Sequence, residues 1–228
     1  MRLIKLEDPN VLPAGTGYGC AFSPDNTYLA VAHDRSPYVT IYERNNDTFT
    51  KLSNPLTLPA GLGKGCSFAC TQDGTYLAVT HQTLPCLTLY KLDGGAFFKL
   101  SNPLISPTAS PANECSFTAD GVYLAVAHNI SPCLTVYKRT GDTFTKLSDP
   151  DVLPVGMGLG CSFTLDGAYL AVGHTYAPYI TIYKKDEDSF IKLENPESLP
   201  ISPVNSCSFT GDGMYLAIGQ IQSPYLPK

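Results

Sequence analysis

Short runs of alternating apolar and polar residues, separated by turn-forming residues, recur along the whole chain. The stretch 160–196 shows the pattern once and predicts strands at 161–164, 169–172, 179–183 and 190–193. Alternation over four to eight residues, rich in β-branched and aromatic side chains, is typical of strands with one buried face. The pattern therefore predicts an all-β protein.

The four-strand pattern repeats five times. In each unit the first strand begins near a cysteine, the second begins with tyrosine, a proline precedes the third, and Lys-Leu ends the fourth. The cysteines are Cys20, Cys66, Cys115, Cys161 and Cys207, with spacings of 46, 49, 46 and 46 residues. The second unit has a two-residue insertion around 69–70, and one extra residue lies between 107 and 115. A period of about 46 residues with four strands is close to that of β-propeller blades, which bury their faces by packing around a ring.

We therefore predict a five-bladed β-propeller of four-stranded antiparallel blades, forming a single domain over residues 1–228. The predicted blades are approximately 17–54, 63–102, 112–149, 158–195, and 204–228 together with 2–6. Residues 3–6 match a fourth strand, whereas the last unit stops early in its third strand. These complementary ends predict that residues 2–6 close the ring as the outer strand of the last blade. The alternative is that the chain is an excerpt from a longer array.

An Asp-Gly pair links the first two strands of most units. The pairs are Asp73-Gly74, Asp120-Gly121, Asp166-Gly167 and Asp212-Gly213, and Asn26 takes the place of glycine in the first unit. Glycine and asparagine tolerate the positive φ that a tight turn requires. We expect hairpin turns at all five places.

All four histidines lie at one position of the repeat, the end of the second strand. They are His33, His81, His128 and His174, and Gln220 stands at the fifth position. One interpretation is a ring of polar groups around a binding surface. The other is that each imidazole hydrogen-bonds the loop of its own blade, and a residue repeated in every unit favours this second interpretation.

The loops on the histidine side vary between units, whereas the turns on the opposite side are nearly uniform. Variable loops on a uniform frame commonly form binding surfaces, although drift in unconstrained loops would look the same. The candidate contact residues on this side are Tyr18, Lys64, Met157 and Tyr176. Together with the four histidines and Gln220, they make up the predicted binding set.

The sequence predicts no catalytic residues, no metal site and no cofactor. Each aspartate of an Asp-Gly turn lies at the opposite end of a short strand from the histidine of its unit. Metal ligands must converge to about 2 Å from the ion, and no Cys-x-x-Cys pair is present. Equivalent cysteines of neighbouring blades should be about 10 Å apart, too far for a disulfide, so we expect small buried hydrophobic side chains.

Composition excludes several classes of partner. The net charge is −5 with no basic block, which argues against nucleic-acid binding. No run approaches the roughly 18 apolar residues of a membrane span, and the first residues lack the apolar core of a secretion signal. We therefore expect a cytoplasmic product, or a virion component made in the cytoplasm, and the oligomeric state stays open.

The segment 22–31, Phe-Ser-Pro-Asp-Asn-Thr-Tyr-Leu-Ala-Val, resembles the Ser-Pro-Asp-Gly hairpin of WD40-type β-propeller repeats, and related segments occur in all five units. The resemblance implies a propeller that acts as a scaffold for protein interactions. The chain departs from the family pattern because Tyr42-Glu43 and its counterparts replace Trp-Asp, and there is no tryptophan. The style of near-identical tandem copies is also similar to repeats of bacteriophage and bacterial genomes.

Two functions follow as expectations. The first is a non-enzymatic scaffold that binds a protein through the histidine side, within a phage or bacterial assembly. The alternative is a lectin-like propeller that binds glycans at shallow sites near Tyr38, Tyr176, Tyr179 and Tyr225, since five-bladed lectins are of similar size. Cys86 and Cys133 stand at the Tyr38 position in two units, which weakens the alternative.

Overall fold

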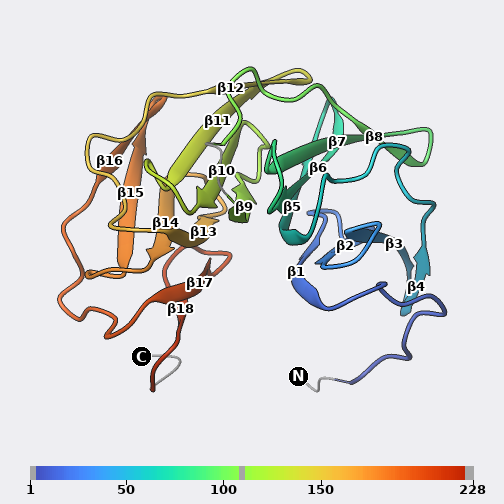
Figure 1. Cartoon of the computed structure of the whole chain (residues 1–228), viewed down its shortest axis with the longest axis horizontal. Coiled ribbons are helices and arrows are strands. Elements are labelled where there is room, and N and C mark those ends of the chain that lie inside the picture. The colour runs from blue at the N-terminus through green and yellow to red at the C-terminus, as the bar shows by residue number, and fades with distance from the viewer. Residues whose placement is uncertain (1–3, 108–110, 224–228) are drawn as a thin grey trace.

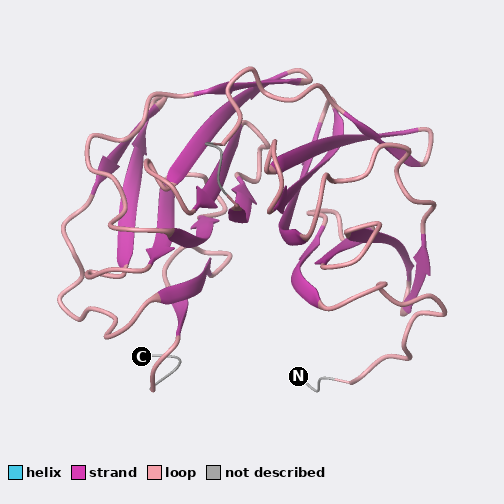
Figure 2. Cartoon of the chain, viewed as in Figure 1, coloured by secondary structure: helices cyan, strands magenta, loops and turns pink. Residues whose placement is uncertain are grey.

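The computed structural model describes residues 4–107 and 111–223, and within these ranges it consists of strands and loops (Figure 2). Eighteen strands are present, and the described residues contain no helix. It follows that none of the described segments is a helix suited to cross a membrane. The predicted all-β class is confirmed.

The strands form four antiparallel four-stranded sheets and one two-stranded sheet. The first sheet comprises β1 (Gly17–Phe22), β2 (Tyr28–His33), β3 (Val39–Asn45) and β4 (Thr48–Lys51). The second comprises β5 (Gly63–Thr71), β6 (Gly74–His81), β7 (Leu87–Asp93) and β8 (Ala96–Lys99). The third comprises β9 (Ala112–Phe117), β10 (Tyr123–His128), β11 (Leu134–Thr140) and β12 (Thr143–Lys146). The fourth comprises β13 (Gly158–Phe163), β14 (Tyr169–His174), β15 (Ile180–Asp186) and β16 (Ser189–Lys192), and the fifth comprises β17 (Val204–Phe209) and β18 (Leu216–Gln220).

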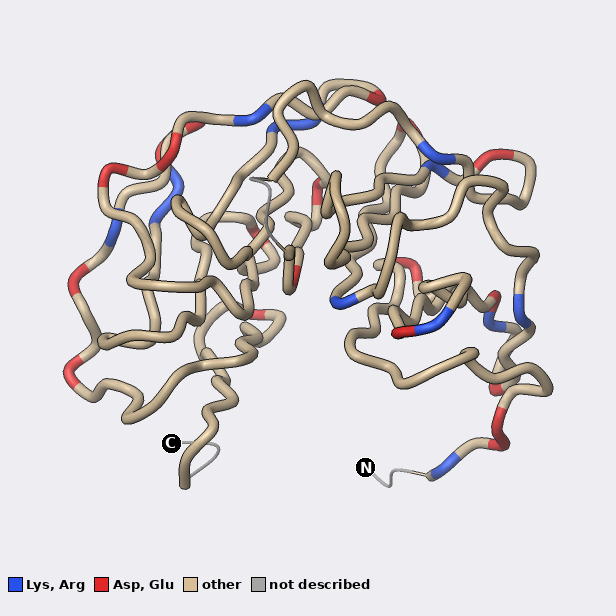
Figure 3. Tube along the Cα trace, in the orientation of Figure 1, with Lys and Arg blue, Asp and Glu red and all other residues tan. Residues whose placement is uncertain are grey.

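The sheets are arranged as successive blades of an arc (Figure 1). The first strand of each sheet lies on the inner side of the arc, and β4, β8, β12 and β16 lie along its outer rim. Consecutive first strands contact one another, from β1 to β5 and onward to β17. Charged residues lie mainly toward the outer rim (Figure 3). The predicted repetition of four-stranded antiparallel blades is therefore present.

The hydrophobic core lies between neighbouring sheets, because a single blade cannot bury both of its faces. Between the third and fourth sheets, Phe190 packs against Phe163 and Tyr123, with ring centroids 6.0 and 6.3 Å apart. The thiol of Cys161 reaches across the same interface to the carbonyl oxygen of Ala125, 3.8 Å away. The first-strand cysteines thus pack as small buried side chains, with the exception of the exposed Cys20.

The turns between first and second strands follow the sequence-based expectation. Asn26, Gly121, Gly167 and Gly213 have φ values of 59°, 65°, 67° and 71°. In the second unit the insertion lengthens the hairpin, since pairing continues to Thr71 opposite Gly74. Gly74 there has φ of 131°, outside the left-handed helical region that the other four residues occupy.

Closure of the ring is not confirmed. The described sheets form an open arc, with the first and the fifth sheet on either side of its opening (Figure 1). Residues 4–6 belong to no strand, and Ile4 is exposed. β17 and β18 pair only with each other in the described part of the chain. Residues 2–3 of the predicted closing strand, and residues 224–228 of the last predicted blade, lie outside the described residues.

Candidate binding face

One end of the sheets, called here the turn face, carries the connections from second to third strands together with the loops that precede the first strands. Strand direction alternates within each antiparallel sheet, so both kinds of connection emerge at the same end. All nine residues of the predicted binding set occur in or next to these connections. The turn face is therefore where a site built from them would lie.

The four histidines are completely buried beneath this face. Each Nε2 is hydrogen-bonded at 2.9 Å to the hydroxyl of a threonine seven residues later, on the third strand of the same sheet. The threonines are Thr40, Thr88, Thr135 and Thr181. The imidazoles cannot touch a macromolecular partner, so the structure favours the interpretation that they stabilise their own blades.

Burial also fixes the charge state of these histidines. Loss of solvation lowers the pKa of His81 and of His128 to about 4, and it lowers the pKa of His33 and His174. The rings are therefore neutral near pH 7. In the fifth sheet, Gln220 accepts a hydrogen bond from the backbone N–H of Ile201 through its Oε1, at 3.1 Å.

The backbone of each turn is held in one conformation. The N–H of His174 donates to the carbonyl of Tyr179 at 2.9 Å, and the N–H of Tyr179 donates to the carbonyl of Tyr176 at 2.8 Å. The residue after the proline has φ between 66° and 68° in all four complete sheets, although it is tyrosine or cysteine rather than glycine. The turns are thus rigid supports for the side chains at their tips.

The sequence-predicted contact residues form two pairs. The Nζ of Lys64 lies 4.2 Å from the centre of the Tyr18 ring, which links the first strands of the first two sheets. Met157 and Tyr176 lie in segments that are joined by two backbone hydrogen bonds, from Thr175 to Met157 and from Tyr176 to Val155. Tyr176 is 65% exposed and Met157 is 42% exposed. The structure brings these residues together in pairs and not into one pocket.

Three further exposed apolar residues were not singled out in the sequence. Leu84, Ile130 and Ile221 lie in the turns that follow the second strands of the second, third and fifth sheets. The sequence does indicate these residues, because each is an apolar side chain in a predicted turn, within three positions after His81, His128 or Gln220. The first turn differs: Asp34 there accepts a hydrogen bond from the N–H of Thr16.

Sequence reasoning also missed Glu114, on the inner strand β9. Its Oε1 accepts the backbone N–H of Cys115 at 3.0 Å, and it lies so close to Gly65 that a Cβ there would clash with it. Loss of solvation raises the pKa of Glu114 to about 7. The signal for it is that the other units carry glycine or serine at this position, namely Gly19, Gly65, Gly160 and Ser206.

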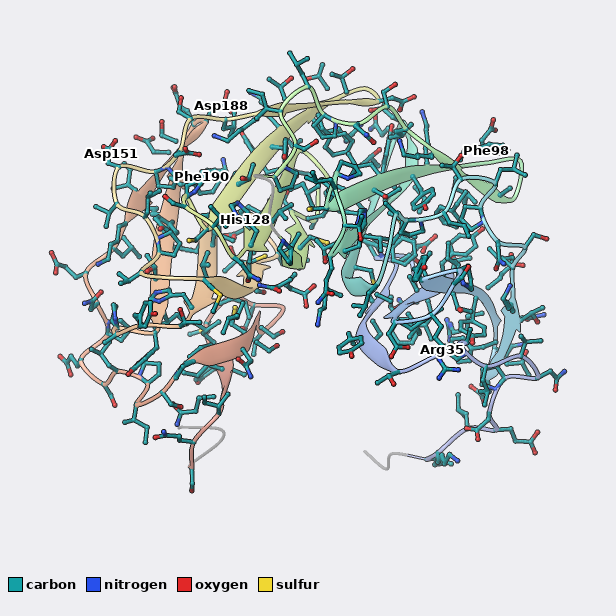
Figure 4. The ribbon with its side chains drawn as sticks, viewed as in Figure 1. Arg35, Phe98, His128, Asp151, Asp188 and Phe190 are labelled. Carbon is teal, nitrogen blue, oxygen red and sulfur yellow. The ribbon has the colours of Figure 1, made fainter. Side chains whose placement is uncertain are left out.

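The face offers little for catalysis. Threonine–histidine pairs resemble a nucleophile beside a base, but they are buried and recur in every complete sheet. Burial raises the pKa of the Cys66, Cys115 and Cys161 thiols well above the usual range, which keeps them protonated. Within residues 4–107 and 111–223, no three histidine, cysteine or acidic side chains converge as metal ligands. Figure 4 places His128 toward the middle of the arc and Asp188 at the outer rim.

The glycan interpretation gains no support from the geometry. Tyr38 and Tyr179 are half-buried beside the turn backbone, and Tyr225 lies outside the described residues. At the Tyr38 position of the second and third sheets, Cys86 and Cys133 are buried. Equivalent aromatic platforms are thus absent from these two sheets.

No protein-family model matches the chain, and no curated protein matches it either. Among solved structures, a protein from Lactobacillus plantarum superimposes with a TM-score of 0.69 and 16% identity, covering 96% of this chain and 72% of its own. Hydrazine synthase from Kuenenia stuttgartiensis superimposes with a TM-score of 0.63 and 15% identity, covering 89% of this chain and 61% of its own.

At such identities the likeness shows the fold alone: repeated antiparallel blades in a propeller-like arrangement. It does not support the WD40 assignment specifically, nor a phage or lectin role. The chain spans less than two thirds of the hydrazine synthase chain, whose activity is a property of that protein.

Proposed function

We propose that the chain is a non-enzymatic, WD40-like scaffold whose turn face binds another protein. The observation that carries the proposal is the set of exposed apolar side chains at the turn tips, in particular Leu84, Ile130, Tyr176 and Ile221. Their positions and neighbours in the turns differ between units, whereas the second, third and fourth sheets beneath Leu84, Ile130 and Tyr176 share one frame. Exposed apolar surface on a rigid frame is typical of protein interaction sites.

The chemistry of the face suits a protein partner better than a small ligand. Tyrosine and methionine are enriched in the cores of protein interfaces, and Tyr18, Tyr176 and Met157 are exposed here. The Lys64–Tyr18 pair supplies a cation beside an aromatic ring. Because the hydrogen-bonded turns are already ordered, binding would lose little conformational entropy.

The opposite face has a different character, which provides a control. Four of its five turns, all but that of the second sheet, share one scheme. In the fourth sheet, for example, Asp166 accepts hydrogen bonds from the Thr164 hydroxyl at 2.6 Å and the Ala168 N–H at 3.0 Å. Leu165 and Met214 are exposed there. A variant of these two residues therefore changes apolar surface without touching the turn face.

The test compares two variants as bait in co-purification from the source cells, after cross-linking. In the first, seven residues of the turn face are replaced by serine: Tyr18, Lys64, Leu84, Ile130, Met157, Tyr176 and Ile221. In the second, Leu165 and Met214 are replaced by serine. The expected result is loss of the partner with the first variant only, at unchanged melting temperatures. Retention of the partner by the first variant would exclude the turn face.

A phage or bacterial assembly as the setting is supported by the style of the tandem repeats, and identifying the cross-linked partner tests it. Completion of a fifth blade by residues 2–6 is supported by their match to the fourth strands. If they complete it, removing residues 1–7 should lower the melting temperature.

A further inference from the structure

We propose that the face opposite the turn face binds a small primary alkylammonium ion with an apolar body, in a hollow between the hairpin turns of the fourth and fifth sheets. These turns join first to second strands and carry Leu165, Asp166, Gly211 and Asp212. The site shares no residue with the contact set of the turn face, so the inference stands apart from the proposed function. Its lining residues all lie between positions 24 and 213, so neither end of the chain takes part.

The hollow has two adjoining parts. The first has a volume of about 220 Å³ and lies between the two turns, lined by Leu165, Asp166, Gly211, Asp212 and Gly213. The second has a volume of about 310 Å³, shares Leu165 and Gly211 with the first, and extends along the first strands of the neighbouring sheets. The second part alone reaches the lower end of the range of small-molecule sites, about 300–1,000 Å³.

The second part is apolar because the phenylalanines of the first strands converge on it. Those of the second to fifth sheets all line it, namely Phe68, Phe117, Phe163 and Phe209. The first strands lie on the inner side of the arc and contact one another, which brings these equivalent side chains together (Figure 1). Phe163 is 7% exposed and packs against Phe190, so its ring is held in place. An apolar group can therefore be buried here without ordering this wall.

The first part is anionic. Asp166 and Asp212 each accept hydrogen bonds from a threonine hydroxyl and a backbone N–H, and all of these bonds go to Oδ1. Neither Oδ2 receives a hydrogen bond from a described residue, and neither carboxylate forms an ion pair with one. The threonine hydroxyls lower the pKa of both carboxyl groups, so both are ionised near pH 7. Both Oδ2 atoms can therefore accept N–H groups of an ammonium ion.

The space between these two turns exists because Gly211 has no side chain. The residues at the same repeat position are Pro24, Gln72, Ala119 and Leu165. A Cβ on Gly211 would meet no atom within 4 Å, and its φ is not in the left-handed region, so neither packing nor the backbone requires glycine.

The distance between neighbouring turns widens at the same place. A Cβ on Gly167, in the fourth turn, would lie 2.9 Å from Cγ2 of Thr118 in the third. A Cβ on Gly213, in the fifth turn, would lie 3.4 Å from Cγ2 of Thr164 in the fourth. The fifth turn is thus the more loosely packed against its neighbour, which leaves room for a ligand.

The order of the two parts determines the chemistry of the ligand. The phenylalanines would surround an apolar body of about the size of one ring, and a short chain would carry the ammonium group to the carboxylates of Asp166 and Asp212. An anion of the same shape would be repelled by both carboxylates. A neutral molecule would gain only the apolar contacts. The charge of the hollow therefore selects a cation.

The test titrates the full chain with phenylbutylamine and follows the ligand by saturation-transfer difference NMR. The expected result is saturable binding with a dissociation constant on the order of 1 mM or lower, as is usual for so small a ligand. Phenylbutanol keeps the apolar body without the charge and should bind several-fold more weakly. Phenylbutanoate, the anion, should not bind.

Three variants of the protein locate the site, each with its melting temperature measured. Gly211→Leu fills the hollow and should abolish binding, and Leu165 shows that the turn accepts leucine at this repeat position. The double variant Asp166→Asn and Asp212→Asn keeps both Oδ1 acceptors and removes both charges. It should weaken binding of the amine about 2- to 5-fold per exposed ion pair and leave binding of the alcohol unchanged. Asp120→Asn is the matched control, because Asp120 has the same role in the third turn and lines neither part.

Four results would overturn the proposal. One is the absence of saturable binding of phenylbutylamine up to about 10 mM. Another is equal binding of the amine and the alcohol, since the carboxylates would then play no part. Full binding by Gly211→Leu, or equal losses in Asp120→Asn and the double variant, would place the ligand elsewhere on the surface.

Discussion

Replacing Glu114 by glutamine should stabilise the protein at pH 8 far more than at pH 5. Glu114 lies on the inner strand β9, with its Oε1 bonded to the Cys115 N–H. Loss of solvation raises its pKa from 4.5 to about 7. The folded protein therefore holds a neutral acid at pH 5 and a poorly solvated carboxylate at pH 8. Glutamine keeps the acceptor oxygen and cannot ionise.

The size of the effect follows from proton linkage. Between pH 4.5 and about 7 the folded state retains a proton that the unfolded state releases. The stabilisation from protonated Glu114 is thus fully present below pH 4.5 and is lost as pH rises through about 7. At roughly 1.4 kcal/mol per pKa unit, the loss between pH 5 and pH 8 is about 2–3 kcal/mol.

Urea unfolding of both proteins at pH 5 and pH 8 measures this loss. Burial lowers the pKa of His81 and His128, so these residues add stability as pH rises from about 4 to 6.5, equally in both proteins. The difference between wild type and Glu114→Gln therefore isolates Glu114. Glu43→Gln, at an exposed site on β3, is the matched control. If the difference in unfolding free energy is the same at both pH values, the reasoning is refuted.

Three further predictions concern the frame and can be checked by urea unfolding or thiol labelling. Thr88→Val leaves the buried Nε2 of His81 without its hydroxyl partner and should lower the free energy of unfolding by about 1–3 kcal/mol. Thr88→Ser keeps the hydroxyl and should retain most of this free energy. Equal losses in the two variants would argue against the hydrogen bond. Arg139→Met should cost about 1–3 kcal/mol, because this 6% exposed side chain donates to the carbonyls of Gly121 and Gly141 and pairs with Asp73 of the second sheet. The exposed counterpart Arg44→Met should cost less, and equal costs would argue against a role for this contact between sheets. A thiol reagent should label Cys20 alone at an early stage in the native protein, and Cys20→Ser should remove the fast phase; a fast phase that persists would contradict its unique exposure.

Features set within one unit could be predicted from the sequence. The positive φ of Gly167 and Asn26 follows from a tight turn between two alternating runs, which is a local requirement. The strand order within each blade follows likewise, because consecutive strands joined by short turns pair antiparallel. The interpretation of the histidines as structural is favoured for the same reason: the threonine partner lies seven residues later in the same unit.

Features set between units could not be predicted. The unit pattern determines which faces are apolar, but not the angle between successive sheets, so the open arc was not foreseen. The raised pKa of Glu114 depends on the approach of Gly65 from a neighbouring sheet, about 50 residues away in the chain. The exposure of Cys20 also depends on neighbouring sheets. Among residues 4–107 and 111–223, no sheet packs on that side of the first sheet, so Cys20 lacks the inter-sheet contact that Cys161 makes with Ala125.

The free energy of unfolding of such an array is close to the sum of the intrinsic stability of each sheet and the interface energies between neighbouring sheets. The two end sheets have fewer such interfaces, so they are the weakest parts. The first-strand Phe22 is 52% exposed where its counterpart Phe68 is 5% exposed, and Tyr215 is 69% exposed where Tyr76 is 1% exposed. The hydrophobic cluster at the interface to the fifth sheet has three buried members among the described residues, Ala171, Ile180 and Cys207, whereas the cluster between the third and fourth sheets has eleven. Local opening should therefore begin at β17 and β18, where the fewest contacts must break.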